Sequence, residues 1–365
     1  MDTDIKISKE DSAFLTYLRS ISIFIIVFGH IGGFWAFKPY SEFLHVFVPV
    51  FFFISGAVSL PSYTRSKSIF HYYLKRFTGL LVPYYLLCLL CLLVSILQNG
   101  EIPLFDWHNL SLWLQLSPPG GASPFPLGHI WFLHTLFFII LISPLYFHFV
   151  NNKKILAILL FLAITPSAIQ LIYDIDNSFY LFGNNLFKPT VHSSFFIFGF
   201  MLFTLPRLNQ TKLLMVLCLG TALLSVFVVY LFSLNIDYEY HTFAPDLYYV
   251  AGSFSAIFAI LIAKKLLLKI IESLSLLKVP LKFLHHHTFS IYLLHVPVVF
   301  LFNRFFMPED LNAKDIKYAL FKLLFVLAVT SIVSIPFTYV SKKVTSVIID
   351  SGVLLFSSLR TSNQH

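Results

Sequence analysis

The sequence has little charge. Only 12% of its 365 residues are Asp, Glu, Lys or Arg, against roughly 25% in ordinary soluble domains. Hydrophobic residues make up 58% of the chain, and the mean hydropathy is +0.81. This balance excludes disordered chains, coiled coils and soluble enzymes. It predicts a chain that spends most of its length in a lipid bilayer.

Cysteine is scarce as well. Three cysteines, Cys88, Cys91 and Cys218, lie in apolar segments and are too few for the framework of a secreted disulfide scaffold. Cys88 and Cys91 have the spacing of a redox pair, but packing as small apolar side chains is the favoured interpretation.

Long apolar stretches fill the rest of the chain. A membrane-spanning helix needs about 20 mostly apolar residues. Ten stretches meet this condition: 13–36, 43–60, 79–98, 127–149, 155–173, 191–206, 212–234, 247–263, 287–306 and 318–340. The predicted fold class is therefore all-α, a polytopic membrane bundle of about ten transmembrane helices.

The positive charges sort by side of the membrane. Eighteen of the 25 Lys and Arg fall in the termini and alternate loops, and five fall in the opposite loops. Because cytoplasmic loops carry the excess of Lys and Arg, both termini are predicted to be cytoplasmic. The net charge of +8 then reflects topology, and we expect no nucleic-acid partner. We predict one transmembrane domain over residues 1–345 and a short cytoplasmic tail over 346–365.

Acidic residues are absent from the middle of every predicted span, which counts against a carboxylate proton relay. The first span instead carries Arg19 and His30, eleven residues apart. Eleven helical steps of about 100° return a side chain to nearly the same face, about 16 Å further along the axis. With the N-terminus inside, Arg19 lies near the cytoplasmic boundary and His30 lies in the outer half of the span.

This geometry has two interpretations. An arginine near the cytoplasm can hold the phosphates of a cytoplasmic donor, while a histidine further out can deprotonate an acceptor hydroxyl. Alternatively, Arg19 only reaches to the lipid headgroups and His30 is a hydrogen-bonded packing residue.

Other polar or aromatic candidates lie in or beside the spans. They are Lys75, Arg76, Ser55, His129, Trp131, Tyr292 and His295. Four of them have a structural alternative: membrane topology for Lys75 and Arg76, helix packing for Ser55, and an interfacial aromatic belt for Trp131. His285, His286 and His287 point in different directions on a helix, so we expect no metal site there. The longest connection, 99–126, either covers an outward-facing site or is a plain connector.

Five short motifs in order resemble the acyltransferase-3 family of membrane proteins, across roughly residues 15–300. The Arg-x10-His signature is Arg19 and His30. The other matching positions are Pro49, Phe51, Phe52, Ser55 and Gly56; Lys75, Arg76, Leu80, Leu81, Pro83 and Tyr84; Gly128, His129, Trp131, Phe132 and Leu133; and Ile291, Tyr292, Leu293 and His295. The chain departs from the family at Gly79, which replaces the second arginine of the third motif.

The resemblance implies a multi-pass acyltransferase of the bacterial plasma (inner) membrane. It implies transfer of an acyl group, most often acetyl, from cytoplasmic acyl-CoA to a hydroxyl of an extracytoplasmic or lipid-linked carbohydrate. His30 is then the catalytic base, with Arg19, Arg76 and Lys75 near the acyl-CoA. Acyl-CoA is a co-substrate, and no permanently bound cofactor or metal is expected.

The remaining candidates, Ser55, His129, Trp131, Tyr292 and His295, are expected at the substrate site. Ser55 as nucleophile or thioester-polarising donor remains an alternative to its packing role. The expected partners are acyl-CoA, the carbohydrate or lipid-linked sugar acceptor, and membrane lipid. The sequence leaves open the acceptor, the acyl group, direct transfer against an acyl-enzyme, and whether the chain acts as a homo-oligomer.

Two rival functions remain. A transporter or flippase of lipid-linked sugars would also need ten spans, but the missing intramembrane carboxylates and broken helices count against it. A non-catalytic membrane subunit has no need of Arg19 and His30 on one helix face.

Overall fold

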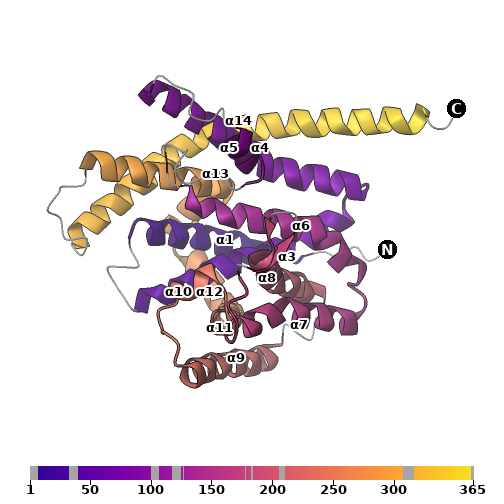
Figure 1. The fold of residues 1–365 in the computed structure, drawn as a ribbon, viewed down its shortest axis with the longest axis vertical. Helices are drawn as coiled ribbons and strands as arrows, with labels where there is room; N and C mark the ends of the chain where they lie inside the picture. Colours follow the sequence, from indigo (N-terminus) through magenta and orange to yellow (C-terminus); the bar gives the residue numbers. More distant parts are fainter. Residues whose placement is uncertain are drawn as a thin grey trace. The chain divides into compact units, whose positions relative to one another are not determined.

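The computed structural model describes residues 7–32, 40–99, 107–116, 125, 127–176, 178–181, 184–204, 210–306 and 316–362. Within these residues the chain is almost entirely helical (Figure 1). The longer helices are α1 (Lys9–His30), α3 (Phe47–Thr64), α4 (Ile69–Asn99), α6 (Trp131–His148), α7 (Lys153–Ile169), α8 (Phe187–Thr204), α9 (Thr211–Phe232), α11 (Leu247–Ile262), α13 (Ser275–Phe306) and α14 (Ile316–Ser362). Shorter elements are η1 (Tyr40–Val46), α5 (Trp107–Leu114), η2 (Gly128–Ile130), α10 (Tyr240–Phe243), α12 (Lys264–Ser273) and a two-stranded antiparallel pair, β1 (Tyr180–Leu181) with β2 (Asn184–Asn185).

The all-α membrane bundle predicted from the sequence is confirmed. A helix occupies each of the ten predicted stretches. Among the described residues, seven helical segments are long and apolar enough to cross a membrane. The three other predicted spans coincide with α7, α8 and α11, of 17, 18 and 16 residues. The number of ten crossings and the side on which the termini lie stay predictions.

Several helices extend beyond the apolar stretches that predicted them. α4 begins at Ile69 instead of residue 79, and α13 begins at Ser275 instead of residue 287. α14 continues to Ser362, so the predicted domain boundary at residue 345 falls inside a helix. Hydropathy marks the part of a helix that suits lipid, whereas backbone hydrogen bonding continues into polar residues beyond it.

The long connection at 99–126 lies mostly outside the described residues. Its described part contains α5, and the Tyr84 hydroxyl of α4 donates to the Trp113 carbonyl of α5 at 2.7 Å. That bond fixes α5 beside α4.

The chain divides into two compact units, residues 1–65 with 141–286 and residues 66–140 with 287–365. In the first unit α3 packs on α8, α7 packs on α8, and α9 packs on α11. Glycines allow the closest of these approaches. A Cβ on Gly56 would lie 1.9 Å from the Phe196 carbonyl oxygen, and a Cβ on Gly199 would lie 2.1 Å from that of Phe53. α3 and α8 therefore touch backbone to backbone, which explains the Ser-Gly pair in the second apolar stretch.

We expect Gly56→Ala to destabilise the protein by about 1–3 kcal/mol, because the added methyl forces α3 and α8 apart. Thermal unfolding of the detergent-solubilised protein measures the loss. Gly220→Ala on α9 is the matched control, since a Cβ there meets nothing within 4 Å. Alanine also forms helix better than glycine by about 1 kcal/mol, so the control should not lose stability. Equal melting temperatures for the two variants would contradict the close α3–α8 contact.

In the second unit α4 packs on α14. The Phe77 ring of α4 lies 4.8 Å from the Phe137 ring of α6, centroid to centroid. On α13 the Phe302 ring is fully buried and contacts Phe321 and Phe325 of α14 at 5.6 and 5.1 Å. Aromatic side chains thus make much of this unit's core.

Candidate functional site

α1 carries both residues of the first-span signature on one unbroken helix. Ser8 caps its N-terminus by accepting a hydrogen bond from the Asp11 amide at 3.0 Å. Lys264 pairs with Glu10 at 3.2 Å and with Asp11 at 2.5 Å, fixing the first turn of α1 beside α12. Because the helix continues to its last residue, His30, the calculated separation from Arg19 of about 16 Å on one face applies.

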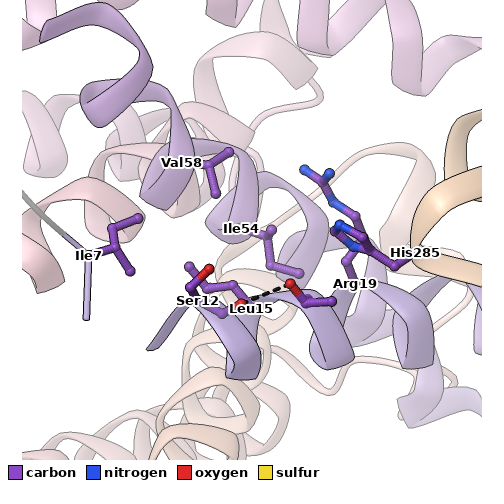
Figure 2. A pocket seen from close by; sticks show the side chains of 8 residues that line it. Ile7, Ser12, Leu15, Arg19, Ile54, Val58 and His285 are labelled. Carbon is purple, nitrogen blue, oxygen red and sulfur yellow. Dashed lines mark hydrogen bonds between the residues drawn. The ribbon is translucent and has the colours of Figure 1, made fainter. Parts of the chain in front are cut away.

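A cavity of about 190 Å³ opens beside the first half of α1 (Figure 2). Ile54 and Val58 of α3 give it apolar walls, and α1 contributes Thr16 and Arg19. His285 of α13 also lines it. The cavity thus combines an apolar interior with one guanidinium and one imidazole, groups that bind anionic oxygen.

The place of His285 follows from a contact between α1 and the beginning of α13. The Ser20 hydroxyl of α1 lies 2.6 Å from the Leu281 carbonyl oxygen and donates to it. His285 lies four residues, or about one helical turn, beyond Leu281 and so shares its face. The sequence shows His285 one helical turn beyond Leu281. It does not show that Leu281 contacts Ser20, so it could not place His285 in the cavity.

At its other end α1 stops directly after His30. The Gly32 amide donates to the Gly29 carbonyl at 2.9 Å, and Gly32 has a φ of 93°, which favours glycine and ends the helix. His30 is exposed in its last turn and interacts electrostatically with His45 of η1. An exposed imidazole at a helix end can exchange protons with a bound substrate.

The loop between α9 and α11 lies beside η1. His241 in this loop is bonded through Nδ1 to the Asp246 carboxylate at 2.6 Å and through Nε2 to the Asn235 carbonyl at 2.7 Å. Burial lowers the pKa of His241, but the hydrogen bond and charge of Asp246 outweigh it, so the pKa lies above the usual value. Asp246 also caps α11 by accepting from the Tyr249 amide at 3.0 Å. These bonds fix the loop conformation.

Ser55 lies half-buried on α3, next to Gly56. The contact of Gly56 with Phe196 accounts for the small residue at position 56. A chemical role for Ser55 stays a prediction.

The second unit brings three of the predicted residues together. The Tyr292 hydroxyl of α13 donates to the His129 carbonyl. The His129 ring lies 5.3 Å from the Tyr292 ring and 5.4 Å from the His295 ring. All three side chains are buried. Nδ1 of His295 donates to the Ile291 carbonyl at 3.1 Å, which assigns its proton and makes Nε2 the acceptor in a neutral ring.

Trp131 begins α6 and is half-buried. It contacts Phe132, whose ring lies 5.4 Å from that of Tyr292. Trp131 is therefore joined to the histidine–tyrosine cluster through one aromatic neighbour.

The predicted donor-binding cations of the second unit lie on α4. Lys75 is exposed, and the Arg76 guanidinium lies 5.8 Å from the centre of the Tyr72 ring. Gly79, where the family motif has its second arginine, is exposed, and a Cβ there would meet nothing within 4 Å. Crowding around the first side-chain atom therefore does not explain why position 79 lacks the family's arginine.

The predicted site residues therefore form two sets. Arg19, His30 and Ser55 belong to the first unit, and Lys75, Arg76, His129, Trp131, Tyr292 and His295 belong to the second. Their catalytic and binding roles stay predictions.

Comparison with known proteins gives one match. No curated protein and no solved structure matches the chain. A family model described as an acyltransferase domain, that of acyltransferase-3, matches residues 12–340. This range contains nearly the whole helical bundle and every site residue predicted from the sequence. The chain therefore belongs to the acyltransferase-3 family of multi-pass membrane acyltransferases.

Proposed function

We propose that the protein moves an acyl group, most often acetyl, from cytoplasmic acyl-CoA to a hydroxyl of an extracytoplasmic or lipid-linked carbohydrate. The observation that carries this proposal is the pairing on α1 of an arginine-lined cavity with a histidine at the helix end. One end suits the anionic donor, and the other suits proton transfer from the acceptor.

The donor end is the cavity beside Arg19. Coenzyme A carries phosphates, which arginine binds through paired hydrogen bonds, and His285 adds a second nitrogen donor. The volume of about 190 Å³ is below the roughly 300 Å³ of small-molecule pockets. The cavity therefore takes one part of the donor, and the rest extends beyond it. An extended pantetheine arm is long enough to span the distance along α1 between Arg19 and His30.

The acceptor end is His30. The imidazole removes the proton from a sugar hydroxyl, and the hydroxyl oxygen attacks the thioester carbonyl carbon. A carbon–oxygen bond forms, the carbon–sulfur bond breaks, and the proton passes from His30 to the departing thiolate. The atoms and charges of this transfer balance with His30 and the two substrates alone.

The direction of transfer follows from the predicted topology. The excess of Lys and Arg in the termini and alternate loops favours a cytoplasmic N-terminus. Arg19 then meets a cytoplasmic donor and His30 an outward acceptor, in the bacterial plasma membrane.

Membranes containing the protein are expected to transfer label from radiolabelled acetyl-CoA to extracytoplasmic glycan or lipid-linked sugar. Matched membranes lacking the protein measure the background. Partitioning the product between organic and aqueous phases separates the two acceptor classes. If the inserted protein transfers no label from acetyl-CoA or from succinyl-CoA, the proposed reaction is wrong.

A further inference from the structure

Three potential metal ligands meet beside the C-terminal end of α1, and one of them is His45, the electrostatic partner of His30. They are Glu42 and His45 of η1 and Glu239 of the loop between α9 and α11. Each offers one ligand atom, and these atoms all lie within 4.8 Å of one another. The three residues come from positions almost 200 apart in sequence, so the fold and not a local turn creates the cluster.

The chemistry of the cluster suits a cation. The Glu42 side chain is 1% exposed, and the Glu239 carboxylate lies within the same 4.8 Å group. Two carboxylates at this distance repel each other, and burial of one of them strengthens the repulsion. A divalent ion bound between the two carboxylates reduces this repulsion.

The distance between Glu42 and His45 is also compatible with two ligands of a common ion. His45 Nε2 lies 3.5 Å from Glu42 Oε2. A charge-assisted N–H···O bond is about 2.7–2.9 Å long. Two ligands at about 2.1 Å from a tetrahedral ion are about 3.4 Å apart.

Neighbouring side chains hold the two segments in place. The Phe43 ring, beside Glu42, lies 5.7 Å from the Tyr238 ring, beside Glu239. Tyr238 is fully buried, and its hydroxyl bonds the Tyr249 carbonyl at 2.6 Å and the Ser253 hydroxyl at 2.7 Å. Ligand positions fixed in this way reduce the loss of side-chain freedom on binding.

We propose that Glu42, His45 and Glu239 bind a divalent transition-metal ion, with water completing its coordination. Two carboxylates and an imidazole suit zinc or manganese, whereas magnesium and calcium prefer sites of oxygen alone. The ion joins η1 to the α9–α11 loop. The test of this proposal is independent of the acyl-transfer reaction, because binding and stability are its readouts.

The test uses the full-length protein, purified in detergent with a tag free of histidine and stripped with EDTA. Titration with ZnCl2 or MnCl2, followed by calorimetry and thermal unfolding, is expected to show about one ion per chain and a raised melting temperature. Glu239→Gln and Glu42→Gln are expected to weaken metal binding about 100-fold or more. Even the loss of a residue that only hydrogen-bonds to a metal ligand lowers metal affinity about 10- to 100-fold. Glu272→Gln, an exposed carboxylate on α12, is the matched control and keeps wild-type affinity.

Three results would overturn the proposal. The first is a folded wild type that binds neither zinc nor manganese saturably. The second is binding that survives in both glutamine variants. The third is equal affinity for MgCl2, which would refute the transition-metal class. Glu239 is only half-buried, so its variant keeps the test valid if Glu42→Gln fails to fold.

Discussion

His30→Ala is expected to reduce acyl transfer by about 10²- to 10⁴-fold, the range that general bases contribute, while the protein remains inserted and folded. The imidazole lies at the exposed end of α1, so its removal leaves no cavity in the bundle. Alanine also favours the helix. The loss should appear in kcat, because the proton is taken in the transition state and not in the binding of either substrate. Initial rates with labelled acetyl-CoA at saturating acceptor measure it.

His148→Ala is the matched control for this variant. His148 is also the exposed last residue of an apolar helix, α6, but it belongs to none of the family motifs. We expect it to keep the wild-type rate. His30→Gln adds a second comparison, since glutamine forms hydrogen bonds but does not take up a proton at neutral pH. Substantial transfer by His30→Gln would show that position 30 only orients a substrate.

The helices were predictable because lipid imposes one strong condition on sequence. A long apolar stretch must satisfy its backbone within the segment, so hydropathy identifies helices such as α1 and α9 without any tertiary information. The helix ends were less predictable. The N-terminal extension of α13 carries Lys278 and Lys282, which hydropathy excludes from a span although they continue the helix. Polar residues that extend a membrane helix look the same in sequence as polar residues in a loop.

The candidate site was predictable only where it lies on one helix. Arg19 and His30 are related by helical periodicity, which sequence alone supplies. His285 reaches the Arg19 cavity because Ser20 bonds the Leu281 carbonyl, a contact between residues 261 positions apart. Likewise, Glu42 and Glu239 meet because Phe43 packs on Tyr238. Such contacts depend on tertiary packing, and no local pattern indicates them.

Arg19→Ala is expected to raise the KM for acyl-CoA by about 10- to 100-fold. Hydrogen bonds to charged groups are worth about 1.5–3 kcal/mol, and each 1.4 kcal/mol is tenfold in affinity. The guanidinium faces the donor cavity about 16 Å from His30, so kcat at saturating donor should change much less than KM. Arg19→Lys keeps the charge but loses the paired geometry, so we expect an intermediate KM. Initial rates over a range of acyl-CoA concentrations measure both constants.

Two further variants decide whether the effect of Arg19 on the KM for acyl-CoA comes from the cavity or from positive charge in general. Arg304→Ala removes an exposed arginine from the last turn of α13 and should leave the KM for acyl-CoA unchanged. His285→Ala, beside Arg19 in the lining of the cavity (Figure 2), should raise the same KM by a smaller factor, because a neutral imidazole donates one hydrogen bond where the guanidinium donates up to five. An equal rise in KM for Arg19→Ala and Arg304→Ala would mean that arginine affects acyl-CoA through positive charge at the membrane surface and not through binding in the cavity. A KM that responds to Arg19 and His285 alone assigns the donor to this cavity, since these two side chains come from different helices and share only its lining.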